Sequence, residues 1–488
     1  MDFRLILASG PEGPGPGALQ TGIYEGLRTA ILEGRLALGE RVPSTRELGS
    51  MLGISRTTAT AAYQRLHGEG YLETAAGSGT FVSRQLPERM LEPERPTAAA
   101  ARAEGPEIAL SERGRSLARA AGLEAAEGSA VIRFRNGRPA LEEFPLELWR
   151  RLAARRLRAV SADMMDYQAD RKGYGPLREA VARYLTRFRA VRCDAEQVIL
   201  VSGSQQALAI AGEILIDAGD PVAVENPGYR GAVLSFATRG ARLHPVAVDG
   251  EGAIPESLPR RAKLAYFTPS HQFPLGGVLA LARRLEIIAW AETAGSVLIE
   301  DDYDSEFRYE GRPIPAMQGL DRSGRVLYIG TFSKVLFPGL RLGYIVAPAR
   351  LAGVIERAKF LADRQCAMLE QLVLTDFLEE GHFERHIRRM RTLYAGRRAA
   401  LAEAVAKHMG PRVRLVGDAA GMHALLEVES SYGETELIAR AAAAGVGVGG
   451  AAACYLAPRL GPPQLILGFA GLGERSIREG IRRLSRVL

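Results

Sequence analysis

Residues 328–344 read YIGTFSKVLFPGLRLGY, and this stretch places Lys334 directly after a short, apolar, predicted strand. The chain of 488 residues has 63 basic side chains, of which 58 are arginine and 5 are lysine. Arginine keeps its proton under ordinary conditions, whereas lysine can lose its proton and attack a carbonyl group. A lysine at this position in an arginine-rich chain therefore indicates a nucleophilic amine.

Further strand-like segments lie on both sides of this stretch, and helical segments separate most of them. They are QVILVSG (197–203), PVAVENP (221–227), LAYFTPS (264–270), SVLIEDDY (296–303), RVLYIGTFS (325–333) and LGYIVAP (342–348). This alternation predicts an α/β domain with a mainly parallel sheet flanked by helices. After a long helical zone at 351–408, the segments ALLEVE (424–429) and LILGFA (465–470) predict a smaller α/β subdomain.

Polar residues and glycines follow several of these strands, at the end where open α/β sheets bind ligands. They comprise a carboxylate, hydroxyl groups, an aromatic ring, a guanidinium group and a glycine-containing turn: Asp301, Tyr303, Tyr229, Thr331, Ser333, Arg341 and Gly203-Ser204-Gln205. With Lys334, they supply the four groups that pyridoxal 5′-phosphate (PLP) needs. These are an amine for an imine, a carboxylate for the pyridine nitrogen, a hydroxyl for the phenolic oxygen and amides for the phosphate. Each residue alone has an ordinary structural explanation, but their combination at strand ends predicts a PLP site.

Residues 18–86 have a different pattern. Apolar residues at helical spacing end at Gly34, and the segment PSTRELGSMLG (43–53) begins a second helix with a Ser44–Glu47 capping box. Ser55 caps a third helix, and YLET (71–74) and GTFVS (79–83) predict a β-hairpin. This order of elements is typical of a winged helix-turn-helix, which places its recognition helix in the major groove of DNA. The predicted DNA contacts are Arg46, Ser55, Arg56, Thr57, Thr58 and the wing residues Gly77 and Gly79.

The charge of this unit does not by itself establish DNA binding. Residues 18–87 contain seven arginines and six glutamates, so the alternative of a capped helix with ordinary surface charges stays open on composition. Residues 87–128, rich in Pro, Ala, Glu and Arg, predict a linker, and residues 129–488 form the larger domain. Three widely separated cysteines and no membrane-spanning segment favour the cytoplasm, and no metal site is predicted.

Both parts resemble known families. Residues 43–82 closely resemble the winged helix of GntR-type regulators, and residues 130–488 resemble fold-type I PLP enzymes, with a large domain and a small C-terminal subdomain. The phrases MDYQADRKGYGPLREAVARYL (165–185), TPSHQFPLGG (268–277), IEDDYDSEFRY (299–309) and EEGHFERHIRRMRTLY (379–394) resemble the MocR/GabR subfamily specifically. The resemblance implies an imine at Lys334, a ring-nitrogen contact at Asp301, a phenolic-oxygen contact at Tyr303, and phosphate contacts at Ser204, Ser333 and Arg341. It also implies a head-to-tail homodimer, in which Tyr167 reaches the neighbouring subunit's phosphate.

Two positions depart from the pattern of aminotransferases. Phe273 stands where those enzymes carry an asparagine near the phenolic oxygen, and Ile466 stands where they carry an arginine for the substrate carboxylate. Arg459 is the nearest basic candidate to replace that arginine, and a surface role explains it equally well. Losing both contacts favours sensing over turnover, because an amino acid without a clamp is poorly oriented for proton transfer.

The remaining histidines and a basic run have mainly structural interpretations. We expect His271 to form hydrogen bonds within a loop, with a ligand or acid–base role as the alternative. His382 and His386 share a helix face without a third metal ligand. The arginines at 385, 388, 389 and 391 predict a solvated helix face, with a second DNA or phosphate contact as the alternative.

The sequence therefore supports three functions. The first is a PLP-dependent DNA-binding transcriptional regulator that senses an amine, an amino acid or PLP itself. The second is an active aminotransferase with an accessory DNA-binding domain. The third is a DNA-binding protein whose large domain only dimerises.

Overall fold

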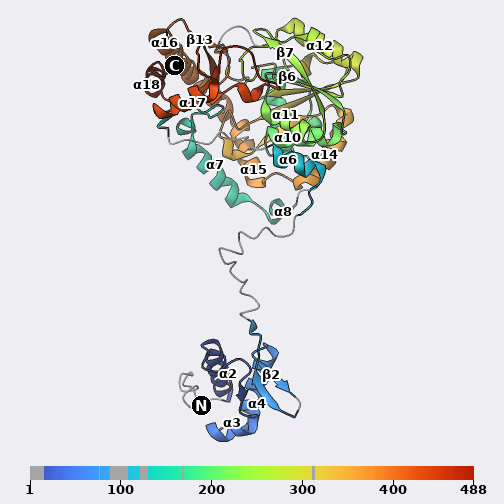
Figure 1. Ribbon diagram of the computed structural model, residues 1–488. Helices are drawn as coiled ribbons and strands as arrows, with labels where there is room; N and C mark the ends of the chain where they lie inside the picture. The colour runs from blue at the N-terminus through green and yellow to red at the C-terminus, as the bar shows by residue number, and fades with distance from the viewer. Residues whose placement is uncertain (1–15, 76, 88–107, 121–129, 168–169, 310–313) are drawn as a thin grey trace. The chain divides into compact units, whose positions relative to one another are not determined.

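The computed structural model describes residues 16–75, 77–87, 108–120, 130–167, 170–309 and 314–488. The chain divides into two compact units, with the boundary between residues 109 and 110 (Figure 1). Each unit has its own hydrophobic core, which is the property that defines a domain.

The N-terminal unit is the predicted winged helix-turn-helix. Its elements are α2 (Pro16–Leu32), β1 (Arg41–Val42), α3 (Thr45–Leu52), α4 (Arg56–Gly68), β2 (Leu72–Ala75) and β3 (Gly79–Val82). Ser44 caps α3 in a complete capping box with Glu47, and Gly53 ends that helix in the left-handed conformation. The three strands form an antiparallel sheet in the order β1-β3-β2, and Leu27, Leu48 and Leu66 are completely buried beside it.

The C-terminal unit is built on an eight-stranded sheet with the order β5-β12-β11-β10-β9-β6-β7-β8. The strands are β5 (Val198–Val201), β6 (Pro221–Asn226), β7 (Arg242–Asp249), β8 (Gly252–Ala253), β9 (Leu264–Phe267), β10 (Val297–Asp302), β11 (Val326–Thr331) and β12 (Gly343–Val346). The strands from β11 through β7 are parallel, while β12, β5 and β8 pair in the antiparallel sense. The prediction of a mainly parallel sheet is confirmed, and β7 and β8 extend it beyond the predicted strands.

Helices cover both faces of this sheet. The helices of this part of the chain are α7 (Leu146–Ala159), α8 (Ala162–Met165), α9 (Gly175–Arg189), α10 (Ser204–Leu215), α11 (Arg230–Ala237), α12 (Leu281–Ala294), α13 (Met317–Leu320), α14 (Ala349–Asp363) and α15 (Met368–Glu379). Alternate residues of β5 face opposite cores. Val198 and Leu200 pack in the core that includes α9 and α15, whereas Ile199 and Val201 pack in the core that includes α10. Burial on both faces explains why these strands read as continuous apolar runs.

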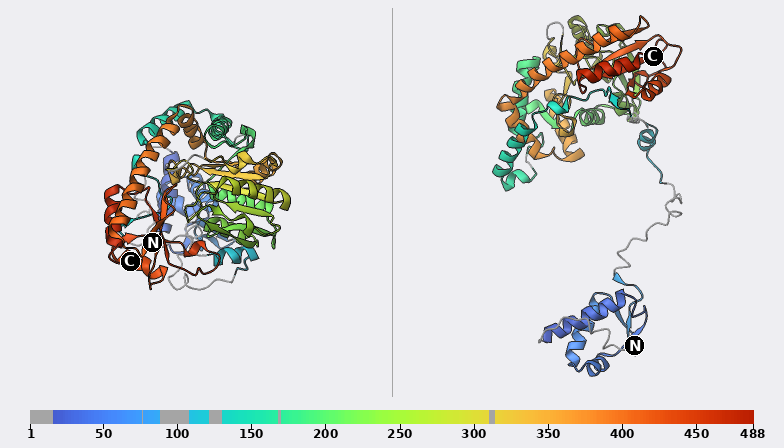
Figure 2. Two further views of the ribbon diagram at one scale, coloured as in Figure 1. Left: turned by 90° about the horizontal axis from the view of Figure 1, so that it is seen from above. Right: turned by 90° about the vertical axis from the view of Figure 1, so that its left-hand side faces the viewer.

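The small subdomain contains the four-stranded antiparallel sheet β13-β14-β17-β16. Its elements are β13 (Val413–Val416), β14 (His423–Val428), α17 (Glu434–Ala443), β15 (Val446–Gly447), β16 (Gly449–Gly450), β17 (Gln464–Gly468) and α18 (Glu474–Leu484). The long helix α16 (His382–His408) runs beside α18 (Figure 2). A distant segment joins this subdomain, because β4 (Ile132–Arg133) pairs with β15 and Phe134 packs in the same core as Ile477 and Ile481.

The range predicted as a linker contains one described helix, α6 (Glu112–Arg119). Arg113 of α6 forms an ion pair of 3.2 Å with Glu213 of α10, so α6 contacts α10 within the C-terminal unit. Residues 88–107 and 121–128 of that range lie outside the described residues. Cys193, Cys366 and Cys454 are free thiols, and no described helix is both long and apolar enough to span a membrane.

Candidate cofactor site and DNA-binding surface

A cavity of about 220 Å³ lies at the carboxyl ends of β9, β10 and β11. Its lining includes Asn136, Gly137, Gly203, Ser204, Gln205, Tyr229, Tyr266, Thr268, Phe273, Asp301, Tyr303, Thr331, Ser333, Lys334, Pro338 and Arg341. The structure therefore brings together every predicted cofactor residue except Tyr167. Their convergence follows from the parallel sheet, because neighbouring parallel strands end at the same edge.

Lys334 follows β11, and its Nζ donates a hydrogen bond of 3.1 Å to the carbonyl oxygen of Gly137. Burial lowers the pKa of this amine, while Asp304 and Asp301 act in the opposite direction. A lower pKa increases the uncharged, nucleophilic fraction of the lysine. Gly137 has a φ of +66°, and a Cβ there would lie 2.3 Å from Nζ, so any side chain at this position would displace the lysine.

Asp301 is the next-to-last residue of β10, and its carboxyl group is buried. One oxygen, Oδ2, accepts a hydrogen bond of 2.7 Å from the Tyr266 hydroxyl, and the other, Oδ1, has no partner among the described residues. Burial raises the pKa of Asp301 to about 7, with a smaller contribution from the neighbouring Asp302. A buried oxygen without a donor is costly, and the N–H of a pyridinium ring would satisfy it.

The opposite end of the cavity has the features of a phosphate site. Gly203 precedes α10 with a φ of +87° and provides no side-chain cap, so the first amides of the helix are free to bind an anion. The Arg341 guanidinium donates a hydrogen bond of 2.7 Å from Nη2 to the carbonyl oxygen of Ser202. A Cβ at Gly203 would lie 3.3 Å from Nη1 of Arg341, so the missing side chain lets this cation approach the turn.

Tyr303 connects the cavity to a buried hydrogen-bond network. Its hydroxyl donates to the carbonyl oxygen of His271 at 2.8 Å and lies 3.1 Å from the Nδ1 atom of that histidine. His271 Nδ1 is 3.0 Å from Asp304 Oδ2, which also accepts a 3.2 Å hydrogen bond from the Met422 amide of the small subdomain. The network therefore links a cavity-lining hydroxyl group to the small subdomain.

The His271 ring lies in this network and contacts Tyr303 and Asp304 of a different segment, whereas the sequence predicted hydrogen bonds within its own loop. The ligand atoms of His271, Asp304 and His423 lie within 4.8 Å of one another, a spacing that could hold a metal ion. Each side chain has at least one protein partner: His271 Nδ1 contacts Asp304, and His423 Nε2 lies 3.0 Å from the carbonyl oxygen of Pro274, while His271 Nε2 is buried without a partner among the described residues. We therefore interpret the three side chains as a hydrogen-bond cluster.

An aromatic wall closes one side of the cavity. The rings of Tyr229 and Phe273 meet edge to face with centroids 5.9 Å apart. The Tyr229 hydroxyl donates a hydrogen bond of 3.4 Å to Gln205 Oε1. Phe273 also packs against the apolar cluster of Leu425, Ala451, Cys454 and Ile466. The two departures from the enzyme pattern, Phe273 and Ile466, are therefore neighbours in one apolar region.

The structure adds residues that the sequence analysis missed, chiefly Tyr266, Thr268, Asn136 and Gly137. Tyr266 lies on β9 beside β10, so strand adjacency could have identified it. Asn136 and Gly137 lie almost 200 residues before Lys334, and no local pattern marks them. Tyr167 does not line the cavity; it is 69% exposed, and the Arg364 guanidinium lies 5.2 Å from its ring centroid.

The other expected structural residues occupy helix α16. His386 is buried, its Nε2 lies 3.0 Å from the carbonyl oxygen of Val335, and burial lowers its pKa to about 4. His382 lies 3.1 Å from Glu380. The arginines at 385, 388, 389 and 391 are exposed, as expected for a solvated helix face.

The predicted DNA-contact residues occupy the start of α4 and neighbouring parts of the N-terminal unit. Ser55 caps α4, and its Oγ lies within 2.8 Å of the Thr57 and Thr58 hydroxyls. The exposed Arg46 and Arg56 side chains form no hydrogen bond or ion pair with other described residues. Arg41, which the sequence analysis did not select, lies beside the wing, since a Cβ at Gly79 would be 2.9 Å from its Nε.

We expect the Arg56→Ala variant to lose about 10- to 100-fold in affinity for its operator, the range for a side chain that contacts a base edge. Arg35→Ala is the matched control, because Arg35 forms an exposed ion pair with Glu33 outside α4. Electrophoretic mobility shift or fluorescence anisotropy on genomic upstream fragments measures both. Equal affinities for the two variants would remove Arg56 from the DNA-binding surface.

The two units define a class of protein: a winged-helix domain on the same chain as a fold-type I PLP domain. The family model of the gntR bacterial regulatory proteins matches residues 19–82, and the model of class I and II aminotransferases matches residues 131–484. The cofactor of the second domain is PLP, and the free Oδ1 of Asp301 beside Lys334 fits that group.

The proteins that this chain resembles along most of its length define its family. The chain is 39% identical to a Rhizobium meliloti protein named probable rhizopine catabolism regulatory protein MocR, covering 95% of this chain and 92% of the relative. It is 32% identical to the HTH-type transcriptional regulator TauR of Rhodobacter capsulatus, covering 97% of each. The crystal structure of LysN, the α-aminoadipate aminotransferase of Thermus thermophilus, matches 77% of this chain and 96% of its own, with a TM-score of 0.71 and 31% identity. This chain belongs to the MocR/GabR subfamily of GntR-type transcriptional regulators.

Proposed function

We propose that this protein controls transcription by coupling the occupancy of the Lys334 cavity to the DNA binding of its winged helix. The observation that supports this proposal most directly is that Lys334, Asp301 and the α10 amides line one cavity of a chain that also contains a GntR-type domain. The sensed molecule is an amine, an amino acid or PLP itself. Because the partner is DNA, we place the protein in the cytoplasm.

PLP supplies an aldehyde that condenses with primary amines and a pyridinium ring that withdraws electrons. The protein residues hold and tune this group. We propose that Asp301 pairs with the ring nitrogen through Oδ1 and that Tyr303 turns its hydroxyl from the His271 carbonyl to the phenolic oxygen. Ser204, Ser333, Arg341 and the first amides of α10 bind the phosphate. Thr331 supports the loop, since its Oγ1 accepts a 3.2 Å hydrogen bond from the Ser333 amide.

The network from Tyr303 through His271 and Asp304 to Met422 supports a route from the cavity to the small subdomain. A ligand that changes the Tyr303 hydrogen bond acts on His271, whose Nδ1 contacts the Asp304 carboxylate, and that carboxylate accepts the hydrogen bond from the Met422 amide. Such a ligand shifts the protein between two states only by its differential affinity for them. We further propose a head-to-tail homodimer in which the exposed Tyr167 reaches the cavity of the partner.

We favour sensing over turnover because the aromatic wall of Tyr229 and Phe273 contains no cationic side chain that could clamp a carboxylate. Phe273 has no side-chain donor, and Ile466 is buried among apolar residues. Proton transfer at the α-carbon needs a precisely oriented substrate, and a missing contact reduces the rate by orders of magnitude.

The test incubates PLP-loaded protein with single amines and amino acids while visible absorbance, keto-acid product and operator affinity are measured. We expect an absorbance change that saturates at one ligand per subunit and a change in operator affinity of about 5-fold or more, the range of typical coupling energies. We expect no accumulation of keto acid. Many keto-acid molecules per subunit, with unchanged operator affinity, would instead favour the aminotransferase function.

A further inference from the structure

The cavity of Lys334 contains very few positive charges. Among the described residues that line it, the only cationic side chains are Lys334 and Arg341. Arg341 lies beside Gly203 at the phosphate end, and Lys334 is the amine for the cofactor aldehyde. Neither cation is available to a second anion, so a ligand that enters beside the cofactor meets no free positive charge from this chain's described lining.

The side of the cavity that Phe273 forms is backed by apolar residues. Phe273 lines the cavity and packs with Leu275, Leu425 and Ile466, and Ile466 is 5% exposed on β17. Burying a carboxylate against such a surface without a partner carries a large desolvation cost. The apolar wall therefore discriminates against a negative charge next to the reacting amine.

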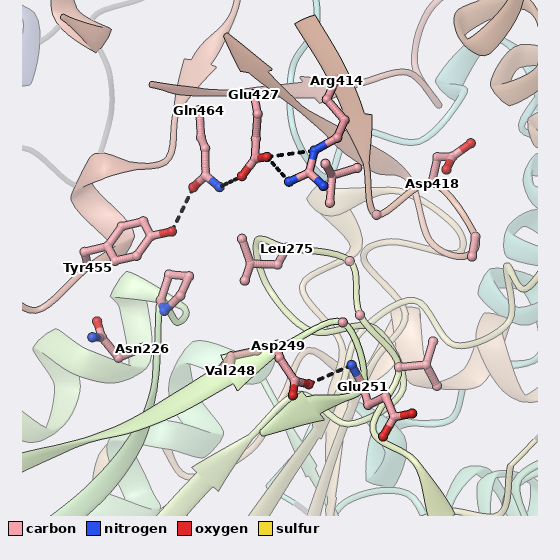
Figure 3. Close-up of a pocket in the computed structure, with 18 of the residues that line it drawn as sticks. Asn226, Val248, Asp249, Glu251, Leu275, Arg414, Asp418, Glu427, Tyr455 and Gln464 are labelled. Atoms are coloured by element: carbon pink, nitrogen blue, oxygen red, sulfur yellow. Dashed lines mark hydrogen bonds and ion pairs between the residues drawn. The ribbon is translucent and has the colours of Figure 1, made fainter. Parts of the chain in front are cut away.

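Arg459 cannot compensate from its observed position. Its Nη1 donates to the carbonyl oxygen of Pro462, and its Nη2 lies 3.5 Å from Glu427 Oε1. It lines a separate cavity of about 780 Å³, shown in Figure 3, where Glu427 also binds Arg414 and accepts a 2.8 Å hydrogen bond from Gln464. Moving Arg459 toward the Lys334 cavity would break its contacts with Glu427 and Pro462. The same set of hydrogen bonds continues from Glu427 through Gln464, whose Oε1 accepts a 2.8 Å hydrogen bond from the Tyr455 hydroxyl.

The arginines that flank Asn136 and Gly137 also lie elsewhere. Arg135 and Arg138 line a third cavity, together with Glu142 and Gly471. Arg138 lies 3.8 Å from Glu142, and the carbonyl oxygen of Arg135 is close enough to Gly468 to exclude a side chain there. No guanidinium group of these two residues lines the Lys334 cavity.

From these observations we infer that the effector is a primary amine without a carboxylate next to its amino group. The inference rests on the proposed function of the Lys334 cavity. Bound PLP would supply the aldehyde carbon, and the effector nitrogen would replace the Lys334 nitrogen on it, so that one carbon–nitrogen bond forms as the other breaks. The two protons lost by the effector nitrogen would go to the lysine nitrogen, so the exchange needs no oxidant, reductant or co-reactant.

The experiment compares amine and amino-acid pairs that differ only in the carboxylate: 2-phenylethylamine with phenylalanine, 3-methylbutylamine with leucine, and ethanolamine with serine. Each is titrated into the PLP-loaded, full-length protein, and the visible spectrum and operator affinity are recorded. We expect every amine that binds to have an apparent Kd at least about tenfold below that of its amino acid. Amino acids that bind as tightly as their amines would overturn the inference.

Two variants test the physical cause. Ile466→Arg places a guanidinium group in the apolar wall, and we expect amino-acid affinity to rise about tenfold or more relative to the Ile466→Leu control. Arg459→Met should leave amino-acid affinity unchanged, whereas a decrease would identify Arg459 as a carboxylate ligand and overturn the inference.

Different results would contradict the amine inference and the proposed function. If PLP-loaded protein gives no spectral response to any primary amine and PLP alone changes operator affinity, the cavity senses only its cofactor and the amine class is overturned. If neither PLP nor amines change operator affinity, the proposed coupling itself is wrong.

Discussion

The Lys334→Ala variant should bind PLP at least about 100-fold more weakly than the unchanged protein and lose the visible absorbance of a lysine-linked cofactor. The amine in question is buried, is held at 3.1 Å from the carbonyl oxygen of Gly137, and has a lowered pKa. Alanine removes the nucleophile and leaves Asp301 and the phosphate site in place, so residual PLP binding is non-covalent. We expect the effector response of operator affinity to fall below about twofold, since typical coupling exceeds that value.

Two further variants test whether the loss comes from the missing amine or from damage to the fold. Lys334→Met keeps a chain of similar length without an amine and should lose the absorbance as completely as the alanine variant. Lys263→Ala changes an exposed lysine at the start of β9 and should retain absorbance and response. Unfolding curves check that all variants remain folded. A Lys334→Met protein with the full visible band would show that another amine holds the cofactor.

The Asp301→Asn variant should have two opposite effects: weaker PLP binding and a more stable cofactor-free protein. Asparagine cannot pair as an anion with the pyridinium nitrogen, so we expect PLP affinity to fall about 10- to 100-fold, the loss for a buried charge-assisted contact. The same substitution removes a buried carboxyl group whose pKa is raised to about 7. In the unfolded chain this pKa is about 3.9, so folding disfavours the ionised form.

The sign of the pH dependence follows from this shift. Because the folded state binds the Asp301 proton more tightly, the contribution of Asp301 to the stability of the cofactor-free protein declines as pH rises from about 4 to about 7 and is then constant. The unfolding free energy of the Asp301→Asn variant minus that of the unchanged protein should therefore increase by about 2–3 kcal/mol between pH 5 and pH 8, at 1.36 kcal/mol per pKa unit. Denaturant unfolding of both cofactor-free proteins at the two pH values measures it. A constant difference would mean that Asp301 ionises normally.

Local sequence patterns predicted much of the site. Lys334, Asp301 and the Gly203–Gln205 turn each follow an apolar strand, and parallel strands collect such positions at one edge whatever the details of packing. In the N-terminal unit, the Ser44 and Ser55 caps and the Gly53 turn depend on neighbours within four residues, so they were also predictable.

Long-range packing determined the remaining features. Gly137 reaches Lys334 because the pairing of β4 with β15 brings residues 132–137 to the small subdomain. The hydrogen bond from Tyr266 to Asp301 depends on β9 lying beside β10. The sequence left Arg459 as a candidate carboxylate ligand, and its contacts with Glu427 and Pro462 place it in a different cavity.

The sequence by itself determined the class of this protein, because capping motifs, strand periodicity and the lysine at a strand end are short-range features. Only the tertiary structure decided which groups lack partners: Oδ1 of Asp301 is unpaired among the described residues, and the wall around Ile466 is apolar. The apolar wall depends on contacts between segments more than a hundred residues apart, and the pairing of Asp301 depends on β9 lying beside β10. The physical reason is that desolvation and pairing of a side chain are set by what surrounds it in space, and they decide what the Lys334 cavity can bind.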